Sequence, residues 1–179
     1  MGQVHKVLIL LPSRGFRADV YQRVRDALEL AGFGVAEAAP NPVRAVASRG
    51  DVVYPDFAVD QVRPETWDAL LFLADDGVDE LRRLPRVWQL AQNVALRGGV
   101  VGALGAAVEV LALAGLLAGR RATGPPDQRS HLEAHGARLE NAAVVAEGNV
   151  VTGRDASVAE EWAEAVVAAL HRYRDRPRP

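Results

Sequence analysis

The chain contains no cysteine among its 179 residues. Without thiols it can form no disulfide, no thiolate metal site and no cysteine nucleophile. Lysine is nearly absent as well, since Lys6 is the single lysine and the other basic residues are arginines. Acidic residues outnumber basic ones by 23 to 21, which disfavours a nucleic-acid partner. Any metal ligand is therefore expected to come from histidine or a carboxylate.

A convincing membrane or export segment is also lacking. Residues 98–118 approach the length of a membrane span, but they include Glu109. A carboxylate at mid-bilayer would cost about 2.5 kcal/mol or more, and the many glycines and alanines indicate a buried strand, a turn and a buried helix. The N-terminus shows no basic region followed by a long apolar region, as a signal peptide would. We therefore expect a cytoplasmic protein without a membrane partner.

Strand and helix patterns alternate along the chain. Residues 6–11 form a continuous apolar run, which is typical of a strand buried on both faces. Residues 17–31 carry apolar side chains at helical spacing and stop at Gly32, a typical C-cap. Residues 33–38 return to strand character and complete a β-α-β unit, which predicts a parallel sheet. Further strands and helices are expected at residues 67–73, 85–96, 100–104, 106–113, 126–135, 142–146 and 149–151.

The remaining segments complete a single α/β domain. Residues 51–62 contain a proline and short alternating pieces, so we expect them at the edge of the sheet. The last helix is expected to open at Ser157, which forms a capping-box pattern with Glu160. A chain of this length fits one domain, predicted over residues 1–173, and residues 174–179 are expected to form a frayed tail of arginine and proline.

Several stretches resemble the ThiJ/PfpI superfamily. Residues 101–106, VGALGA, lie at a strand-to-helix junction where that family usually reads Ala-Ile-Cys-His-Gly. Residues 132–137, 144–145 and 148–154 are similar to the family's C-terminal stretch in order and spacing. The resemblance implies a flavodoxin-like three-layer sandwich with a mostly parallel central sheet and helices on both faces. It also implies a homodimer or higher oligomer, in a family that includes peptidases, glyoxalases, deglycases and chaperones.

The departures from this family concern its catalytic parts. The Cys-His pair falls on Gly105 and Ala106, which provide neither a nucleophile nor an imidazole. The acidic residue that the family presents from its first helix falls at Val20, with Asp19 beside it, and its Pro-Gly-Gly turn becomes residues 73–75. Three parts have changed together, which indicates a lineage that has abandoned thiol catalysis.

We expect a ligand pocket where the carboxyl ends of the strands meet, as in other open α/β sheets. The pocket candidates are Gly105, Ala106, Asp19, Arg17, Asp75, Asp76, Glu109 and Arg154. Gly105 either leaves a void with free N–H groups beside it or serves only as a tight turn. The hypothesis is a non-catalytic protein, with no cofactor or metal, that binds a small anionic or carbonyl ligand or a protein partner.

Alternatives remain at this point. A non-thiol glyoxalase, deglycase or hydrolase, or a purely structural oligomer component, would fit the same family. Glu109 faces either a pocket or interface, where it would need a partner such as arginine, or an exposed helix surface. Asp75 and Asp76 suit a solvated loop better than a cation site. His131 and His135 lack a third ligand, so we interpret them as part of a surface helix.

Overall fold

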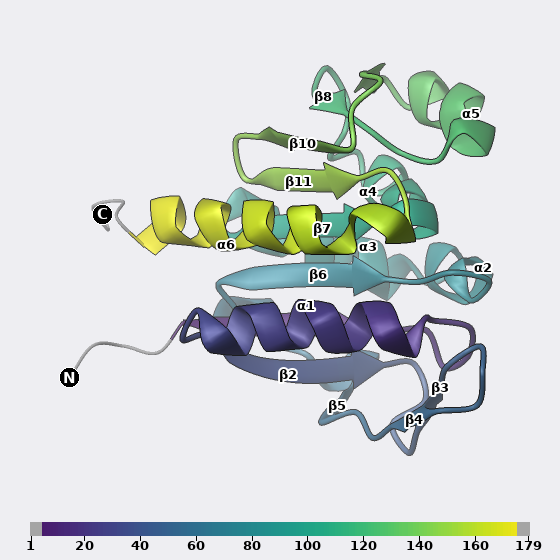
Figure 1. Ribbon diagram of the computed structural model, residues 1–179, viewed down its shortest axis with the longest axis vertical. Coiled ribbons are helices and arrows are strands. Elements are labelled where there is room, and N and C mark those ends of the chain that lie inside the picture. The colour runs from purple at the N-terminus through teal and green to yellow at the C-terminus, as the bar shows by residue number, and fades with distance from the viewer. Residues whose placement is uncertain (1–4, 175–179) are drawn as a thin grey trace.

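A seven-stranded sheet forms the centre of the computed structural model, which describes residues 5–174 (Figure 1). Its strands are β1 (Lys6–Leu10), β2 (Gly34–Ala39), β5 (Phe57–Ala58), β6 (Ala69–Leu73), β7 (Val100–Leu104), β10 (Val144–Glu147) and β11 (Val150–Gly153). They lie in the order β10-β11-β7-β6-β1-β2-β5. All neighbours pair in parallel except β10, which is antiparallel to β11. The predicted mostly parallel α/β sheet is confirmed.

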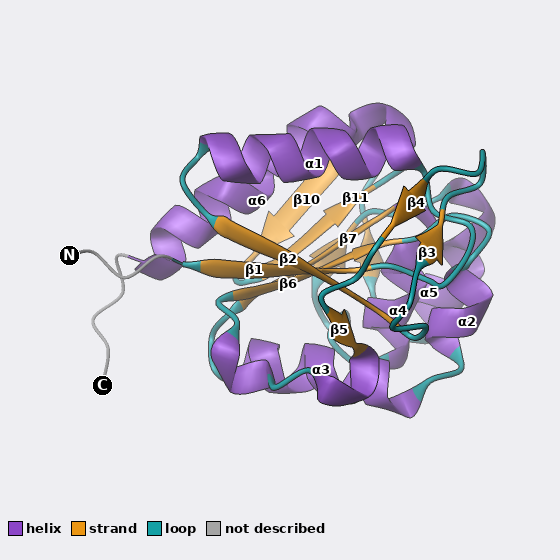
Figure 2. Ribbon diagram, turned by 90° about the horizontal axis from the view of Figure 1, so that it is seen from below, coloured by secondary structure: helices purple, strands orange, loops and turns teal. Residues whose placement is uncertain are grey.

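Helices cover both faces of this sheet and make a three-layer sandwich (Figure 2). The helices are α1 (Ala18–Leu30), α2 (Val78–Arg82), α3 (Pro85–Leu96), α4 (Val108–Leu113), α5 (Arg129–Ala134) and α6 (Ala159–Arg174). One face carries α1 and α6, and the opposite face carries α2 and α3. Two small additional sheets pair β3 (Ala45–Val46) with β4 (Val52–Val53) and β8 (Arg121–Ala122) with β9 (Arg138–Leu139).

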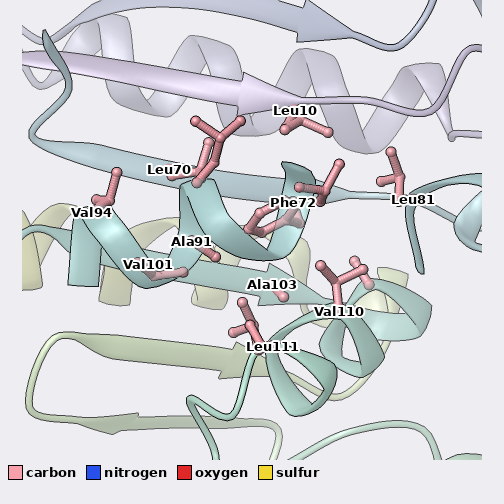
Figure 3. Packing of buried hydrophobic residues seen from close by; sticks show 14 of the residues in the cluster. Leu10, Leu70, Phe72, Leu81, Ala91, Val94, Val101, Ala103, Val110 and Leu111 are labelled. Atoms are coloured by element: carbon pink, nitrogen blue, oxygen red, sulfur yellow. The ribbon is translucent and has the colours of Figure 1, made fainter. Parts of the chain in front are cut away.

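The side chains of β1 explain why its sequence is continuously apolar. Val7 and Ile9 pack in the core beneath α1 and α6, whereas Leu8 and Leu10 pack in the core beneath α3 and α4. Successive side chains of a strand point to opposite faces, so residues 7–10, which are covered on both faces, are all buried, and only Lys6 at the start of β1 is exposed. Figure 3 shows the second core, where Leu10 and neighbouring strand residues meet side chains of the covering helices.

Most predicted elements occupy their expected positions. The helix at 85–96 and the strand at 100–104 begin and end at the predicted residues. Residues 51–62 do lie at the edge, where β5 is the last strand beside β2. The predicted capping box at Ser157 is wrong. Asp155 is the cap, since its carboxylate accepts a hydrogen bond from the Ser157 backbone N–H at 2.9 Å and Ser157 lies inside the first turn.

Two predictions concern the ends and the apolar segment. Of the predicted frayed tail, Arg174 is the last residue of α6, and residues 175–179 lie outside the described residues. Residues 98–118 fold as β7, a turn and α4, as expected. Within residues 5–174, no helix is long and apolar enough to cross a membrane.

Candidate functional site

A cavity of about 270 Å³ lies at the carboxyl edge of the sheet. Its wall consists of Arg17 and Val20 after β1, residues 73–75 after β6, residues 104–106 after β7, Pro125, Asp127 and Gln128 before α5, and Asp155 and Ala156 after β11. These segments are far apart in sequence, and the parallel sheet brings them to one edge. The carboxyl ends of β1, β6 and β7, which the sequence predicted to meet, therefore do lie together in the structure.

The turn from β7 into α4 depends on Gly105. Its φ is +61°, a left-handed conformation that residues with a Cβ rarely adopt. A Cβ built on Gly105 would lie 3.6 Å from the Asp155 Cα, which is an ordinary contact distance. The backbone angle, and not a lack of space, is thus what favours glycine here. The cavity has room beside the turn for a side chain that Gly105 does not provide.

Two carboxylates of the cavity wall experience opposite environments. Burial, reinforced by the charge of the adjacent Asp76, raises the pKa of Asp75. The hydrogen bond from the Ser157 hydroxyl, assisted by Arg154, lowers the pKa of Asp155. Asp75 is therefore the group in this wall that is more easily protonated, and Asp155 is held as an anion.

The free hydrogen-bonding groups of the cavity are mainly acceptors. The guanidinium of Arg17 donates to Asp19 through Nε at 3.2 Å and Nη2 at 2.8 Å. The Gln128 Nε2 group donates to the Ala106 carbonyl at 3.3 Å. The Gln128 Oε1 atom is buried and has no hydrogen-bond partner among residues 5–174. Because that atom is buried, the side-chain acceptors that a ligand can reach are the carboxylates of Asp75, Asp127 and Asp155, which suit a ligand that supplies O–H or N–H groups.

The structure divides the predicted pocket residues into two groups. Arg17, Asp75, Gly105 and Ala106 line the cavity. Asp19, Asp76, Glu109 and Arg154 do not: Asp19 borders a neighbouring groove beside α1, Asp76 borders a separate open groove of about 860 Å³, and Arg154 contacts Asp155 from outside the wall. Glu109 is buried in the protein interior.

Burial decides between the two interpretations of Glu109. The residue is 7% exposed, and its Oε1 lies 3.2 Å from Arg82 Nη1. The expected arginine partner is present, whereas the alternative of an exposed helix surface is wrong. Arg82 could not be chosen from the sequence because it lies on another helix, 27 positions away.

Three polar residues of the wall were not among the predicted candidates. Asp127 and Gln128 precede α5, and Asp155 follows β11. The sequence signal that could have found Asp155 is its position two residues before Ser157. His131 belongs to α5 and His135 is the residue that caps its C-terminus. Within residues 5–174 no group of three or more His, Asp or Glu side chains is arranged to hold a metal ion.

The left-handed turn yields a stability prediction. Gly105→Ala should lower the free energy of unfolding by about 1–2 kcal/mol, because the alanine Cβ is strained at positive φ. Gly105→Asn should cost less, since asparagine tolerates this conformation better. Urea unfolding followed by circular dichroism would compare the two variants. Equal losses for alanine and asparagine would show that sterics, and not the backbone angle, set the preference.

Comparisons with known proteins agree with this architecture. The model of the DJ-1/PfpI family matches residues 5–169. Protein dj-1beta of Drosophila melanogaster is 29% identical over 147 residues, which cover 81% of this chain and 79% of that protein. The glutathione-independent glyoxalase DJR-1.2 of Caenorhabditis elegans is 25% identical over 170 residues, with 95% and 91% covered. The crystal structure of a ThiJ/PfpI domain protein from Brachyspira murdochii superposes with a TM-score of 0.91 at 23% identity, covering 96% and 99% of the two chains.

Proposed function

This cysteine-free chain belongs to the DJ-1/PfpI family. We propose that it is a non-catalytic protein that binds a small carbonyl compound in the elbow cavity, which is the cavity beside the turn from β7 into α4. One observation carries the proposal. A glycine occupies the left-handed turn at the mouth of the strand-to-helix elbow, and a cavity of about 270 Å³ is retained beside it. Glycine supplies no atom that could attack a carbonyl, while the cavity can still hold one.

The charges of the wall favour a neutral ligand over an anion. Asp75, Asp127 and Asp155 contribute three carboxylates, and the positive charge of Arg17 is already paired with Asp19. An anion entering such a wall would meet repulsion. Small reactive carbonyl compounds form hydrates in water, and the hydroxyl groups of a hydrate can donate to the carboxylates of the wall, such as Asp75. The name of the glyoxalase among the relatives is consistent with a carbonyl ligand.

A second candidate function rests on the two carboxylates with opposite pKa shifts. Asp75 is the more easily protonated and Asp155 the more firmly ionised. Pairs of this kind can act as acid and base in catalysis. A glyoxalase, deglycase or hydrolase without a thiol would use Asp75 to move a proton to or from a carbonyl hydrate. This enzyme is the alternative that experiments must separate from binding alone.

Ligand binding is predicted for methylglyoxal and tested by isothermal titration calorimetry. Ala106→Leu should weaken binding at least about tenfold, because the larger side chain fills the cavity and a tenfold change needs only about 1.4 kcal/mol. Ala168→Leu is the matched control, since Ala168 lies on the exposed side of α6. Pyruvate should bind more weakly than methylglyoxal. If neither compound binds, or if pyruvate binds better, the proposed ligand is wrong.

Turnover separates the two candidate functions. At high protein concentration the wild-type chain should consume methylglyoxal no faster than a blank, because the wall holds no cysteine, serine, threonine or lysine side chain to attack the carbonyl. The measurement is methylglyoxal depletion with wild type, Asp75→Asn and Asp76→Asn, of which only Asp75 lines the cavity. A reproducible rate that Asp75→Asn abolishes and Asp76→Asn retains would establish the acid–base enzyme instead.

We also propose that the chain forms a homodimer, as the family resemblance implies. The β3–β4 segment offers support, since Val43, Val52 and Tyr54 are 71%, 41% and 75% exposed there. Light scattering coupled to size exclusion should give twice the monomer mass. Tyr54→Arg should dissociate the dimer by placing a charge in the contact, while Leu30→Arg, at another exposed apolar residue, should not. A monomeric wild type would refute this arrangement.

A further inference from the structure

Glu109 is a buried carboxylate whose position next to the cavity is not used by the proposed ligand site. It lies in the first turn of α4, directly after the elbow, and is 7% exposed. A carboxylate removed from water to this extent is destabilising unless it is paired. Its partners therefore tell which parts of the structure depend on it.

Two partners from different helices meet at one oxygen of Glu109. Arg82 Nη1 lies 3.2 Å and His131 Nε2 lies 3.3 Å from Glu109 Oε1. Arg82 also pairs with Asp79 within α2, at 2.8 Å. The His131 Nε2 atom is buried and makes no hydrogen bond among residues 5–174, and Glu109 Oε1 lies within ion-pair distance of it. Glu109 is thus one charged group of α4 that approaches both α2 and α5, and apolar side chains of the three helices also share one core.

Each of these helices continues from a different part of the cavity wall. The α2 helix follows the segment that contains Asp75, the α4 helix follows Gly105 and Ala106, and the α5 helix follows the segment that contains Gln128. A bond between the helices therefore restrains the spacing of the wall segments that precede them. Glu109 is the buried member of these contacts, so removing either partner leaves its charge less compensated and weakens the restraint.

We propose that Glu109 is a positioning residue that clamps the α2 and α5 sides of the elbow cavity onto α4. Arg82 connects Glu109 to the helix that follows the segment around Asp75, and His131 connects it to the helix that follows the segment around Gln128. This proposal rests on the proposed function in one respect, which is that the ligand binds in the cavity whose wall segments Glu109 holds together. Its geometry can be tested without any ligand, so failure of the binding proposal would leave this one standing.

The absence of cysteine makes single-thiol reporters possible. Ala74→Cys places one thiol on the α2 side of the wall, and Gln128→Cys places one on the α5 side. Ala163→Cys places one in the core beneath α6, away from the wall, where Ala163 is 1% exposed. Labelling with a disulfide reagent measures how often each position opens to solvent. The measurement is made on each reporter with and without a change in the clamp.

Glu109→Gln should raise labelling at positions 74 and 128 about tenfold, because loss of the Glu109 charge weakens its contacts with Arg82 and His131 and so favours local opening of both segments. Position 163 should not change. Arg82→Gln should act mainly at position 74 and His131→Gln mainly at position 128, which keeps the test valid if Glu109→Gln does not fold. Asp79→Asn is the matched control and should leave both wall positions unchanged.

Selectivity is the result that a merely stabilising role for Glu109 would not produce. An equal rise at positions 74, 128 and 163 would indicate general loosening of the fold and would overturn the clamp. Unchanged labelling at 74 and 128 in Glu109→Gln would overturn it as well. If Arg82→Gln and His131→Gln affect both wall positions equally, the two sides are not held separately and the proposed arrangement is wrong.

Discussion

Parallel strands that are buried on both faces must all turn at the same edge, because each connection returns through a helix. In this protein β1, β6, β7 and β11 are such neighbours, and the segments that follow their carboxyl ends build one cavity. The apolar core holds these strands in register through side chains that alternate between two helix layers. Position and shape of the cavity are consequences of that core, and the polar residues around it are carried by the turns.

The elbow retains its backbone geometry without the reactive side chain that such turns usually present. A nucleophile in this position must tolerate a strained, left-handed conformation, and Gly105 adopts φ +61° without that strain. The glycine therefore relieves the strain of this turn and at the same time presents no reactive side chain. The surrounding carboxylates, which have no thiolate to assist, form a wall of acceptors that is suited to hydroxyl-bearing ligands.

Two buried carboxylates, one on the sheet and one on a helix, are compensated in the same way in this fold. Glu37 on β2 is 4% exposed and contacts Arg25 and the Tyr21 hydroxyl from α1. Glu109 on α4 meets Arg82 and His131 from two other helices. In both cases an arginine from a neighbouring helix compensates a carboxylate that packing has removed from water. The difference is location, since Glu109 lies beside the cavity wall and links its separate segments.

The sequence by itself determined the α/β class, the parallel sheet and most element boundaries, because hydrophobic periodicity is local and records which faces are buried. It also determined the absence of thiol chemistry and the glycine at the elbow. Tertiary structure decided which polar residues share the cavity: Asp127, Gln128 and Asp155 joined it, and Asp19, Asp76, Glu109 and Arg154 lay outside. It also decided that Asp155 and not Ser157 caps the turn that leads into the last helix, α6. Such pairings depend on distances between segments far apart in the chain, which no local pattern specifies.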